Sequence, residues 1–173
     1  MWLYEKKLQH PVKIKNPNPQ LASIIISQLG GPDGELGASM RYLHQRYACP
    51  YDEVTGILTD VGTEELAHLE MVAAILYQLT KSLSEEQIKN SPFAPYFVDH
   101  TTGVYPVAAS GVPFDMKYVG VKGDILTDLH EDLAADAAII KEQPLRKKSR
   151  KPLKYKAFSH LGKTPGTRIP AII

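Results

Sequence analysis

Hydrophobic residues recur at three- and four-residue steps in three parts of the chain, which is the spacing of one face of an α-helix. The pattern is clearest over residues 51–82. Its members there are Val54, Ile57, Leu58, Val61, Leu69, Val72, Leu76 and Leu79. A helix that faces a core requires such a stripe. We therefore expect a long helix over 51–82 at the centre of the fold.

Two further helical patterns flank this one. The first covers residues 21–47 and is interrupted by the Gly-Gly-Pro-Asp-Gly run at 30–34, so the pattern alone allows one kinked helix or two. Its start at Asn18-Pro19 is typical of a helix N-terminus, where a capping residue precedes proline. The other pattern opens at Gly123-Asp124 and runs to about Ile140. The sequence thus predicts an all-α fold.

Proline and glycine separate these regions. Prolines among residues 1–20 predict an extended lead-in, and residues 91–123 hold enough proline and glycine to predict a long irregular connection. We expect short strands within it, around Phe114 to Val121. Connections of this length are usually functional or serve as crossovers.

Charge divides the chain near residue 140. Residues 1–140 hold 10 basic and 18 acidic side chains, whereas residues 141–173 hold 10 basic side chains and one acid, Glu142. The formal net charge of +1 therefore describes neither part. The basic part has two prolines near its start and no apolar periodicity. We expect a helical domain over 1–140 and a basic, disordered tail over 141–173.

Three interpretations of the tail compete. Its charge would attract nucleic acid or an anionic surface. Alternatively, it is a disordered arm used in assembly. The third interpretation is a shift of reading frame at about codon 136. We favour the shift of frame, so nucleic acid is not an expected partner.

Composition excludes several other classes of protein. Hydrophobic residues make up 43% of the chain and charged residues 23%, which is ordinary for a globular protein. A single cysteine, Cys49, excludes an intrachain disulfide framework and fits a reducing compartment. The chain has no apolar run of about 18 residues, and its first residues do not form a signal peptide. We expect a soluble intracellular protein without membrane contact.

The apolar stripe over 51–82 has a gap that holds Glu65 and His68. Residues three apart lie roughly 60° apart on one helical face and one turn apart along the axis, so both side chains can point at one ion. Such a pair also occurs solvated on helix surfaces. Its place in an apolar stripe favours a buried pair, and a buried carboxylate needs a compensating partner such as a metal ion.

Glu35 adds to this pattern. It follows the glycine-rich run at 30–34 and is flanked by small residues that let helices approach closely. Di-iron and di-manganese carboxylate bundles take a Glu from each of two helices and a Glu-x-x-His from each of the other two. Glu35 followed by Glu65 and His68 matches half of that set in order. The alternative is that Glu35 is a first-turn acid favoured by the helix dipole.

The residues around these positions resemble a known family. Gly-Gly-Pro-Asp-Gly-Glu-Leu-Gly-Ala-Ser-Met-Arg-Tyr-Leu at 30–43 and Leu-Thr-Asp-Val-Gly-Thr-Glu-Glu-Leu-Ala-His-Leu-Glu-Met at 58–71 strongly resemble the manganese catalases. Met-Trp-Leu-Tyr-Glu-Lys-Lys-Leu-Gln at 1–9 and Ser-Gly-Val-Pro-Phe at 110–114 resemble its spore-coat, CotJC-type branch. The resemblance covers about residues 1–136. It implies a ferritin-like bundle whose two manganese ions disproportionate hydrogen peroxide to water and oxygen.

The resemblance also implies roles for single residues. Glu35 and His68 would be terminal ligands of one manganese ion, and Glu65 would bridge the two ions and act as the catalytic residue. In the second half of the site, Asp136 stands where the family has Glu and would be a metal ligand with a shorter side chain. The neighbouring acid Asp132, like Glu131, is expected to be solvated.

The fourth helix of the family, with its own Glu and ligand histidine, has no counterpart in the sequence. His160 is the only histidine after Asp136, and it lies among turn residues, so we do not expect it to be a ligand. His10, His44 and His100 lie on no motif and are expected to be solvated or structural. Two ions are implied by the family, and one or none remain possible here because half of the ligand set is altered.

Two functional hypotheses follow from the resemblance. The first is a manganese-catalase-like enzyme that acts on hydrogen peroxide, with activity impaired where the second ion is lost. The alternative is a structural component of the bacterial spore coat without catalysis. In both, the expected partners are other spore-coat proteins and further copies of this chain as a homo-oligomer. The expected location is the cytoplasm or the spore coat, reached without a signal peptide.

Overall fold

The computed structural model describes residues 5, 7–96, 112 and 114–142, and the side chains of Tyr96 and of residues 136–142 lie outside that description. The described helices are α1 (Pro19–Gly30), α2 (Glu35–Gln45), α3 (Asp52–Thr80), α4 (Glu85–Lys89) and α5 (Ile125–Glu142). Two 3₁₀ turns cover Ala94–Tyr96 and Met116–Tyr118. No strand occurs in these ranges, and the expected all-α fold is confirmed.

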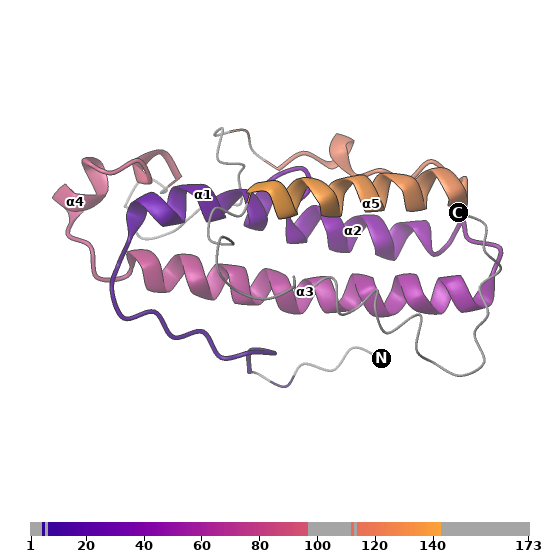
Figure 1. Cartoon of the computed structure of the whole chain (residues 1–173), viewed down its shortest axis with the longest axis horizontal. Coiled ribbons are helices and arrows are strands. Elements are labelled where there is room, and N and C mark those ends of the chain that lie inside the picture. The colour runs from indigo at the N-terminus through magenta and orange to yellow at the C-terminus, as the bar shows by residue number, and fades with distance from the viewer. Residues whose placement is uncertain (1–4, 6, 97–111, 113, 143–173) are drawn as a thin grey trace.

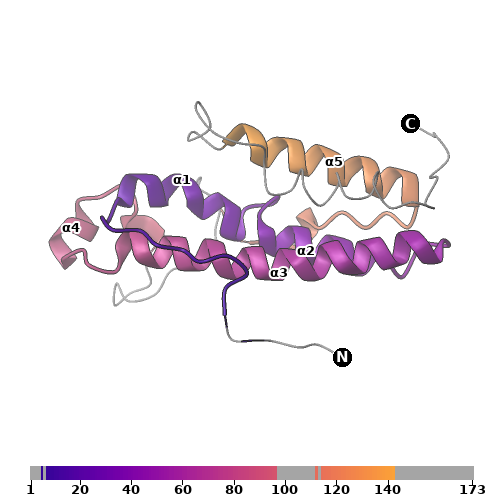
Figure 2. The ribbon, with the colours of Figure 1, turned by 60° about the horizontal axis from the view of Figure 1, so that its bottom comes forward.

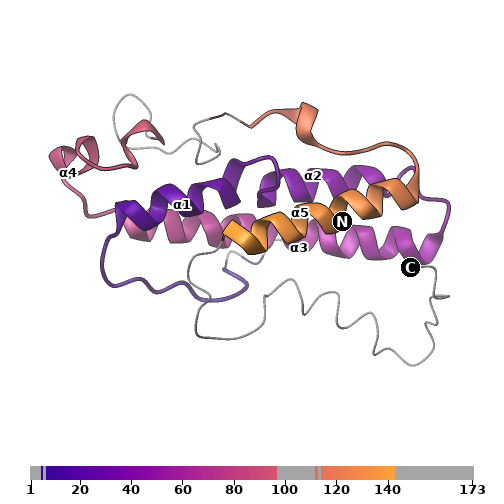
Figure 3. The same ribbon diagram turned by 45° about the horizontal axis from the view of Figure 1, so that its top comes forward.

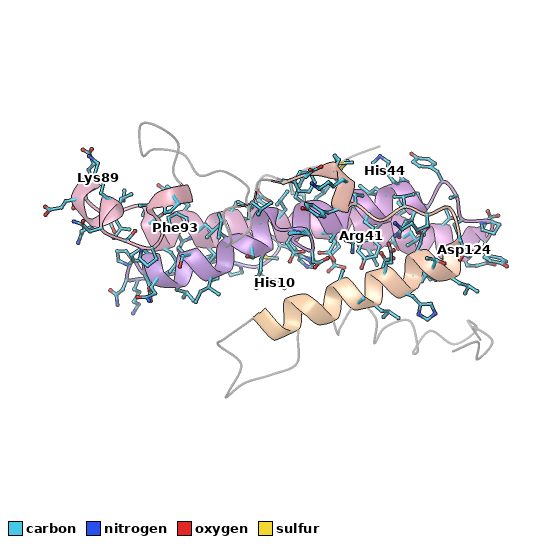
Figure 4. All side chains as sticks on the ribbon, turned by 90° about the horizontal axis from the view of Figure 1, so that it is seen from above. His10, Arg41, His44, Lys89, Phe93 and Asp124 are labelled. Carbon is cyan, nitrogen blue, oxygen red and sulfur yellow. The ribbon has the colours of Figure 1, made fainter. Side chains whose placement is uncertain are left out.

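The long helix α3 is the central element. Helices α1 and α2 follow one another along one side of α3 and run antiparallel to it (Figure 1). Helix α5 lies against α2 and runs back in the opposite direction to α2, as the turned views in Figure 2 and Figure 3 also show. The short α4, which ends at Lys89, lies at one end of the molecule. Helix α5 begins after Asp124 at the other end (Figure 4).

The region 21–47 forms two helices. The side chain of Asn18 accepts a hydrogen bond from the backbone N–H of Leu21 at 3.0 Å, so the predicted N-terminus of α1 is confirmed. The break after α1 needs glycine, because a Cβ on Gly31 would lie 2.5 Å from the carbonyl oxygen of Ser27 and one on Gly34 would lie 2.7 Å from the same atom. This tight turn places Glu35 as the first residue of α2.

The core consists of two apolar clusters along α3. One joins α1, the C-terminal half of α3 and the segment after α4; its buried members are Ala22, Ile26, Val72, Leu76, Leu79 and Phe93. The other joins α2 and the N-terminal half of α3 through Ala38, Tyr42 and Leu58, with Ile125 and Leu129 of α5 packed against it. Glu65 and His68 lie between the two clusters along α3.

Helices α2 and α3 approach each other closely at Gly62. A Cβ on Gly62 would lie 2.8 Å from Cγ of Leu43 and 3.1 Å from Cβ of Tyr42. In the same place the buried hydroxyl of Ser39 donates a hydrogen bond to the carbonyl oxygen of Gly62 at 2.8 Å. The absence of a side chain at residue 62 therefore allows the contact that brings α2 next to the Glu-x-x-His turn of α3.

The extended lead-in is confirmed, and it runs along α3 (Figure 2). The side chain of Gln78 accepts a hydrogen bond from the N–H of Ile14 and donates one to the carbonyl of Val12, both at 2.8 Å. The N–H of Asn18 donates to the carbonyl of Leu79 at 2.9 Å. Since these bonds satisfy backbone groups of a segment without secondary structure, they fix its course along the helix.

The expectation of short strands around Phe114 to Val121 is wrong. The segment contains the 3₁₀ turn Met116–Tyr118, and the side chain of Asp115 accepts from the N–H of Lys117 at 3.0 Å. Farther along, the side chain of Gln45 binds the carbonyl of Gly120 at 2.9 Å. These two backbone groups are thus paired with side chains and not with a neighbouring strand.

Helix α5 continues to Glu142, two residues beyond the expected domain boundary at 140. Residues 143–173 lie outside the described residues, so the division at 140 and the disordered tail stay predictions. Among the described residues, α1 and α2 follow one another and together take one place beside α3 and α5, and α4 has only five residues, so one place of a four-helix core is not filled. None of the described helices has both the length and the apolar character needed to cross a membrane.

Candidate metal centre

Glu35, Glu65 and His68 converge in the interior. Each offers one ligand-type atom, and these atoms all lie within 4.8 Å of one another. The exposed fractions of the three residues are 6%, 2% and 8%. The first turn of α2 supplies Glu35, and the middle of α3 supplies the other two residues. The expectation that Glu65 and His68 point to the buried side of their helix is confirmed.

The imidazole of His68 has two different sides. Its Nδ1 atom lies 2.7 Å from Oε2 of Glu65 and 3.9 Å from Oε2 of Glu35. Its Nε2 atom lies 3.7 Å from Oε1 of Glu64, which precedes Glu65 in the chain. The ring therefore presents Nδ1 to the two buried carboxylates and Nε2 to a third acid outside the group.

The donor set fits a divalent metal ion. Two carboxylates in the interior are costly to desolvate unless a positive charge compensates them. The neutral ring nitrogen of an imidazole completes a set of oxygen and nitrogen donors, which suits manganese or iron. The ligand atoms of these three residues can surround one ion, whereas a second ion needs ligands beyond them.

Asp136, the fourth expected ligand, belongs to α5, but its side chain lies outside the described residues. Its assignment stays a prediction. His160 and His100 also fall outside the described residues, whereas His10 and His44 are exposed, as expected. Cys49 is half-buried and packs against the Ala38, Tyr42 and Leu58 cluster, in agreement with the interpretation as a small apolar residue.

The expectation that Asp132 is solvated is wrong. Asp132 is only 1% exposed, and its Oδ1 accepts a hydrogen bond from Nε2 of Gln45 at 3.0 Å. Its neighbour Glu131 is half-buried, with a carboxylate oxygen 3.8 Å from Nζ of Lys122. The physical reason is that α5 turns Asp132 toward α2, where an amide group compensates for its burial.

Asp132 belongs to a buried polar group that sequence reasoning missed. Asp128, one turn earlier on α5, accepts a hydrogen bond from the N–H of Lys122 at 2.7 Å. Gln45 joins Asp132 to the carbonyl of Gly120. This group connects α2, α5 and the segment before α5. The four-residue spacing of the two aspartates was the available signal, since it places both on one helical face.

The chain is similar to several known proteins. Residues 1–143 match the family model described as manganese containing catalase. The chain is 52% identical over 136 residues to protein CotJC of Bacillus subtilis (strain 168), an alignment that covers 79% of this chain and 71% of CotJC. It is 29% identical over 150 residues to the manganese catalase of the same strain, covering 79% of this chain and 55% of that protein.

The fold of this chain is similar to that of solved structures. Wild-type KatB, a manganese catalase from Anabaena, superimposes with a TM-score of 0.75 and 29% sequence identity. The superposition covers 93% of this chain and 73% of KatB. The chain thus has the ferritin-like fold of its structural relatives, and it spans little more than half the length of the Bacillus manganese catalase.

Proposed function

This chain belongs to the manganese-containing catalase family, and from that premise we propose that Glu35, Glu65 and His68 bind manganese and that the site disproportionates hydrogen peroxide to water and oxygen. The observation that carries the proposal is the convergence of these three buried side chains within 4.8 Å. Bound manganese would supply a redox centre for the electrons exchanged between two peroxide molecules.

The three side chains have distinct roles in this proposal. Glu35 and His68 would be terminal ligands of one manganese ion, and Glu65 would be shared by two ions and act as the catalytic residue. Two carboxylates and one neutral imidazole balance the formal charge of one divalent ion. Their burial excludes bulk water from the reacting groups, which strengthens the electrostatic interactions within the site. Oε2 of Glu65 lies 2.7 Å from Nδ1 of His68, so both ligand atoms face the same position.

The second half of the site decides whether the chain is an efficient enzyme. Asp136 is proposed as a ligand to a second manganese ion, with a side chain one methylene shorter than glutamate. Disproportionation exchanges two electrons, so a site that holds one ion has lost half of its redox capacity. The expected occupancy is therefore two ions in an active chain, and one or none in an impaired chain.

The proposal is tested by metal analysis together with an oxygen electrode. The purified full chain is loaded with Mn²⁺, its metal content is measured, and oxygen release from peroxide is recorded. We expect Glu65→Gln to abolish oxygen release and to weaken Mn²⁺ binding at least about 10-fold, because it removes a charged ligand. Asp60→Asn is the control, because it neutralises an exposed acid on the same helix. It should leave oxygen release and Mn²⁺ binding unchanged. Bound manganese well below two per chain together with no oxygen release rejects the enzymatic function.

A structural role in the spore coat is the second candidate. It is supported by the 52% identity to CotJC, which exceeds the identity to the manganese catalases compared above. In this role the chain assembles with other spore-coat proteins and with copies of itself, and it resides in the coat. This role is supported if the wild type and Glu65→Gln enter the spore coat equally well and neither releases oxygen from peroxide.

A further inference from the structure

We propose that Glu64 is a positioning residue, which orients His68 for metal binding from outside the ligand group, and that Gln9 of the lead-in holds Glu64 in place. The proposal rests on the metal-binding function proposed above. Glu64 precedes the Glu-x-x-His pair and is not one of the three converging ligands.

The first step concerns the two ring nitrogens of His68. Nδ1 faces Glu65 and Glu35, so it is the atom available to a metal ion between those carboxylates. Nε2 is buried and makes no hydrogen bond within the part of the chain that the structure describes. A metal-binding histidine generally donates its other N–H to a carboxylate or carbonyl, which fixes the tautomer and the ring orientation. Nε2 is therefore the donor that needs an acceptor.

Glu64 is in place to be that acceptor. Its Oε1 lies 3.7 Å from Nε2, one helical turn away on the same face of α3. The distance is a few tenths of an ångström beyond a hydrogen bond, and the Glu64 side chain is 39% exposed, so a small rotation closes it. The carboxylate would then favour the tautomer with the proton on Nε2, which leaves Nδ1 as the ligand atom.

The lead-in restrains Glu64 from the other side. Nε2 of Gln9 donates a hydrogen bond to Oε1 of Glu64 at 3.2 Å, which is the same oxygen that faces His68. The lead-in is itself tied to α3 through Gln78. His10, the next residue, lies about halfway along the molecule (Figure 4). A segment 55 residues distant in the chain thus orients the acid that orients the ligand.

The first measurement is Mn²⁺ affinity, obtained by competition with a chelator on the full chain. We expect Glu64→Ala to weaken binding about 10- to 100-fold, the usual cost of losing a carboxylate that supports a ligand histidine. Glu64→Gln keeps an acceptor oxygen and retains most of the affinity, and Gln9→Ala gives a smaller loss than Glu64→Ala. Asp60→Ala removes one acid from the exposed face of α3 and is the matched control for charge.

The second measurement reports the tautomer of His68 directly. The full chain with ¹⁵N-labelled histidine is loaded with Zn²⁺, which is diamagnetic, and long-range proton–nitrogen spectra are recorded. In the wild type we expect Nδ1 bound to zinc and a slowly exchanging proton on Nε2. In Glu64→Ala we expect that proton to exchange rapidly, a change that a merely structural role for Glu64 would not produce.

The outcomes separate this proposal from the function on which it rests. The positioning role is overturned if Glu64→Ala and Asp60→Ala bind Mn²⁺ with equal affinity. It is also overturned if the Nε2 proton of His68 exchanges as rapidly in the wild type as in Glu64→Ala. In both cases metal binding by the three ligands stands. A wild-type chain that binds neither Mn²⁺ nor Zn²⁺ overturns the metal site and the positioning role together.

Discussion

Two pairs of polar side chains occupy buried positions on the helices, Glu65 with His68 on α3 and Asp128 with Asp132 on α5. Both pairs follow helical spacing. The first pair was predicted because it interrupts an apolar stripe. The second pair was missed because Asp128 and Asp132 do not interrupt an apolar stripe along α5. Spacing places two residues on one face, but only the packing partner decides whether that face is buried.

The start of α5 gives a prediction for a single residue. The side chain of Asp124 accepts a hydrogen bond from the N–H of Thr127 at 2.9 Å, and this bond holds the pKa of Asp124 below its ordinary value of 3.8. A carboxyl whose pKa is lowered in the folded state stabilises the fold above its ordinary pKa, and that stabilisation is lost as the pH falls through the lower value. We expect Asp124→Ala to lower the melting temperature near neutral pH.

The pH dependence of this effect is the measurement that checks it. In thermal unfolding followed by circular dichroism, the difference between wild type and Asp124→Ala should shrink as the pH falls below about 4. Asp124→Asn is the control, because asparagine caps a helix without titrating. An unchanged difference between wild type and Asp124→Ala down to the lowest pH would contradict the role of the charged cap.

The helices themselves were predicted closely, but the buried face of α2 was not. The pattern over 51–82 corresponds to α3, Asp52–Thr80. In α2, the apolar residues Leu36, Met40 and Leu43 recur at helical spacing but are only half-buried. The face that meets α3 carries Ala38 and Ser39 among its buried residues. Small residues give no hydrophobic signal, yet they are buried here because α2 and α3 approach closely.

This close contact predicts opposite effects for two glycines of α3. Gly62→Ala would place a methyl group 2.8 Å from Cγ of Leu43. We expect overpacking of about 1–3 kcal/mol, which outweighs a gain in helix propensity of about 1 kcal/mol. Gly56→Ala meets no atom within 4 Å, so it should show the gain alone. Urea unfolding of both variants measures the free energies of unfolding.

The same variants connect the helix contact to the site. Gly62 lies one turn before Glu65, so a displacement of α2 by Gly62→Ala moves Glu35 away from Glu65 and His68. We expect weaker Mn²⁺ binding in Gly62→Ala and wild-type binding in Gly56→Ala. Stabilisation by Gly62→Ala as large as that by Gly56→Ala would show that the contact between α2 and α3 tolerates the added methyl group.

On the scale of the whole molecule, α5 packs Ile125 and Leu129 against the core but also buries two aspartates and exposes two leucines. Asp128 and Asp132 are buried against α2 and the segment before α5, whereas Leu126 and Leu133 are 57% and 47% exposed. Large exposed apolar side chains are typical of surfaces that associate with another chain or element. Within the described part of the chain, no element covers these two side chains.

We therefore expect the exposed leucines of α5 to contribute to a homo-oligomer. The double variant Leu126→Gln, Leu133→Gln should shift the chain toward monomer, as measured by light scattering after size-exclusion chromatography. Tyr77→Gln removes another exposed large side chain, on α3, and is the control. Equal masses for wild type and the double variant would exclude this face from the assembly interface.

The sequence by itself determined the helical class, the long central helix, the family and the face that Glu65 shares with His68. Each of these depends on spacing within one segment, which the repeat of the α-helix fixes. Only the tertiary structure decided that Glu35 reaches that face, that Asp132 is buried, that residues 114–121 form no strand and that Gln9 binds Glu64. These features join segments far apart in the chain, and the packing of side chains between helices, which no local period encodes, brings them together.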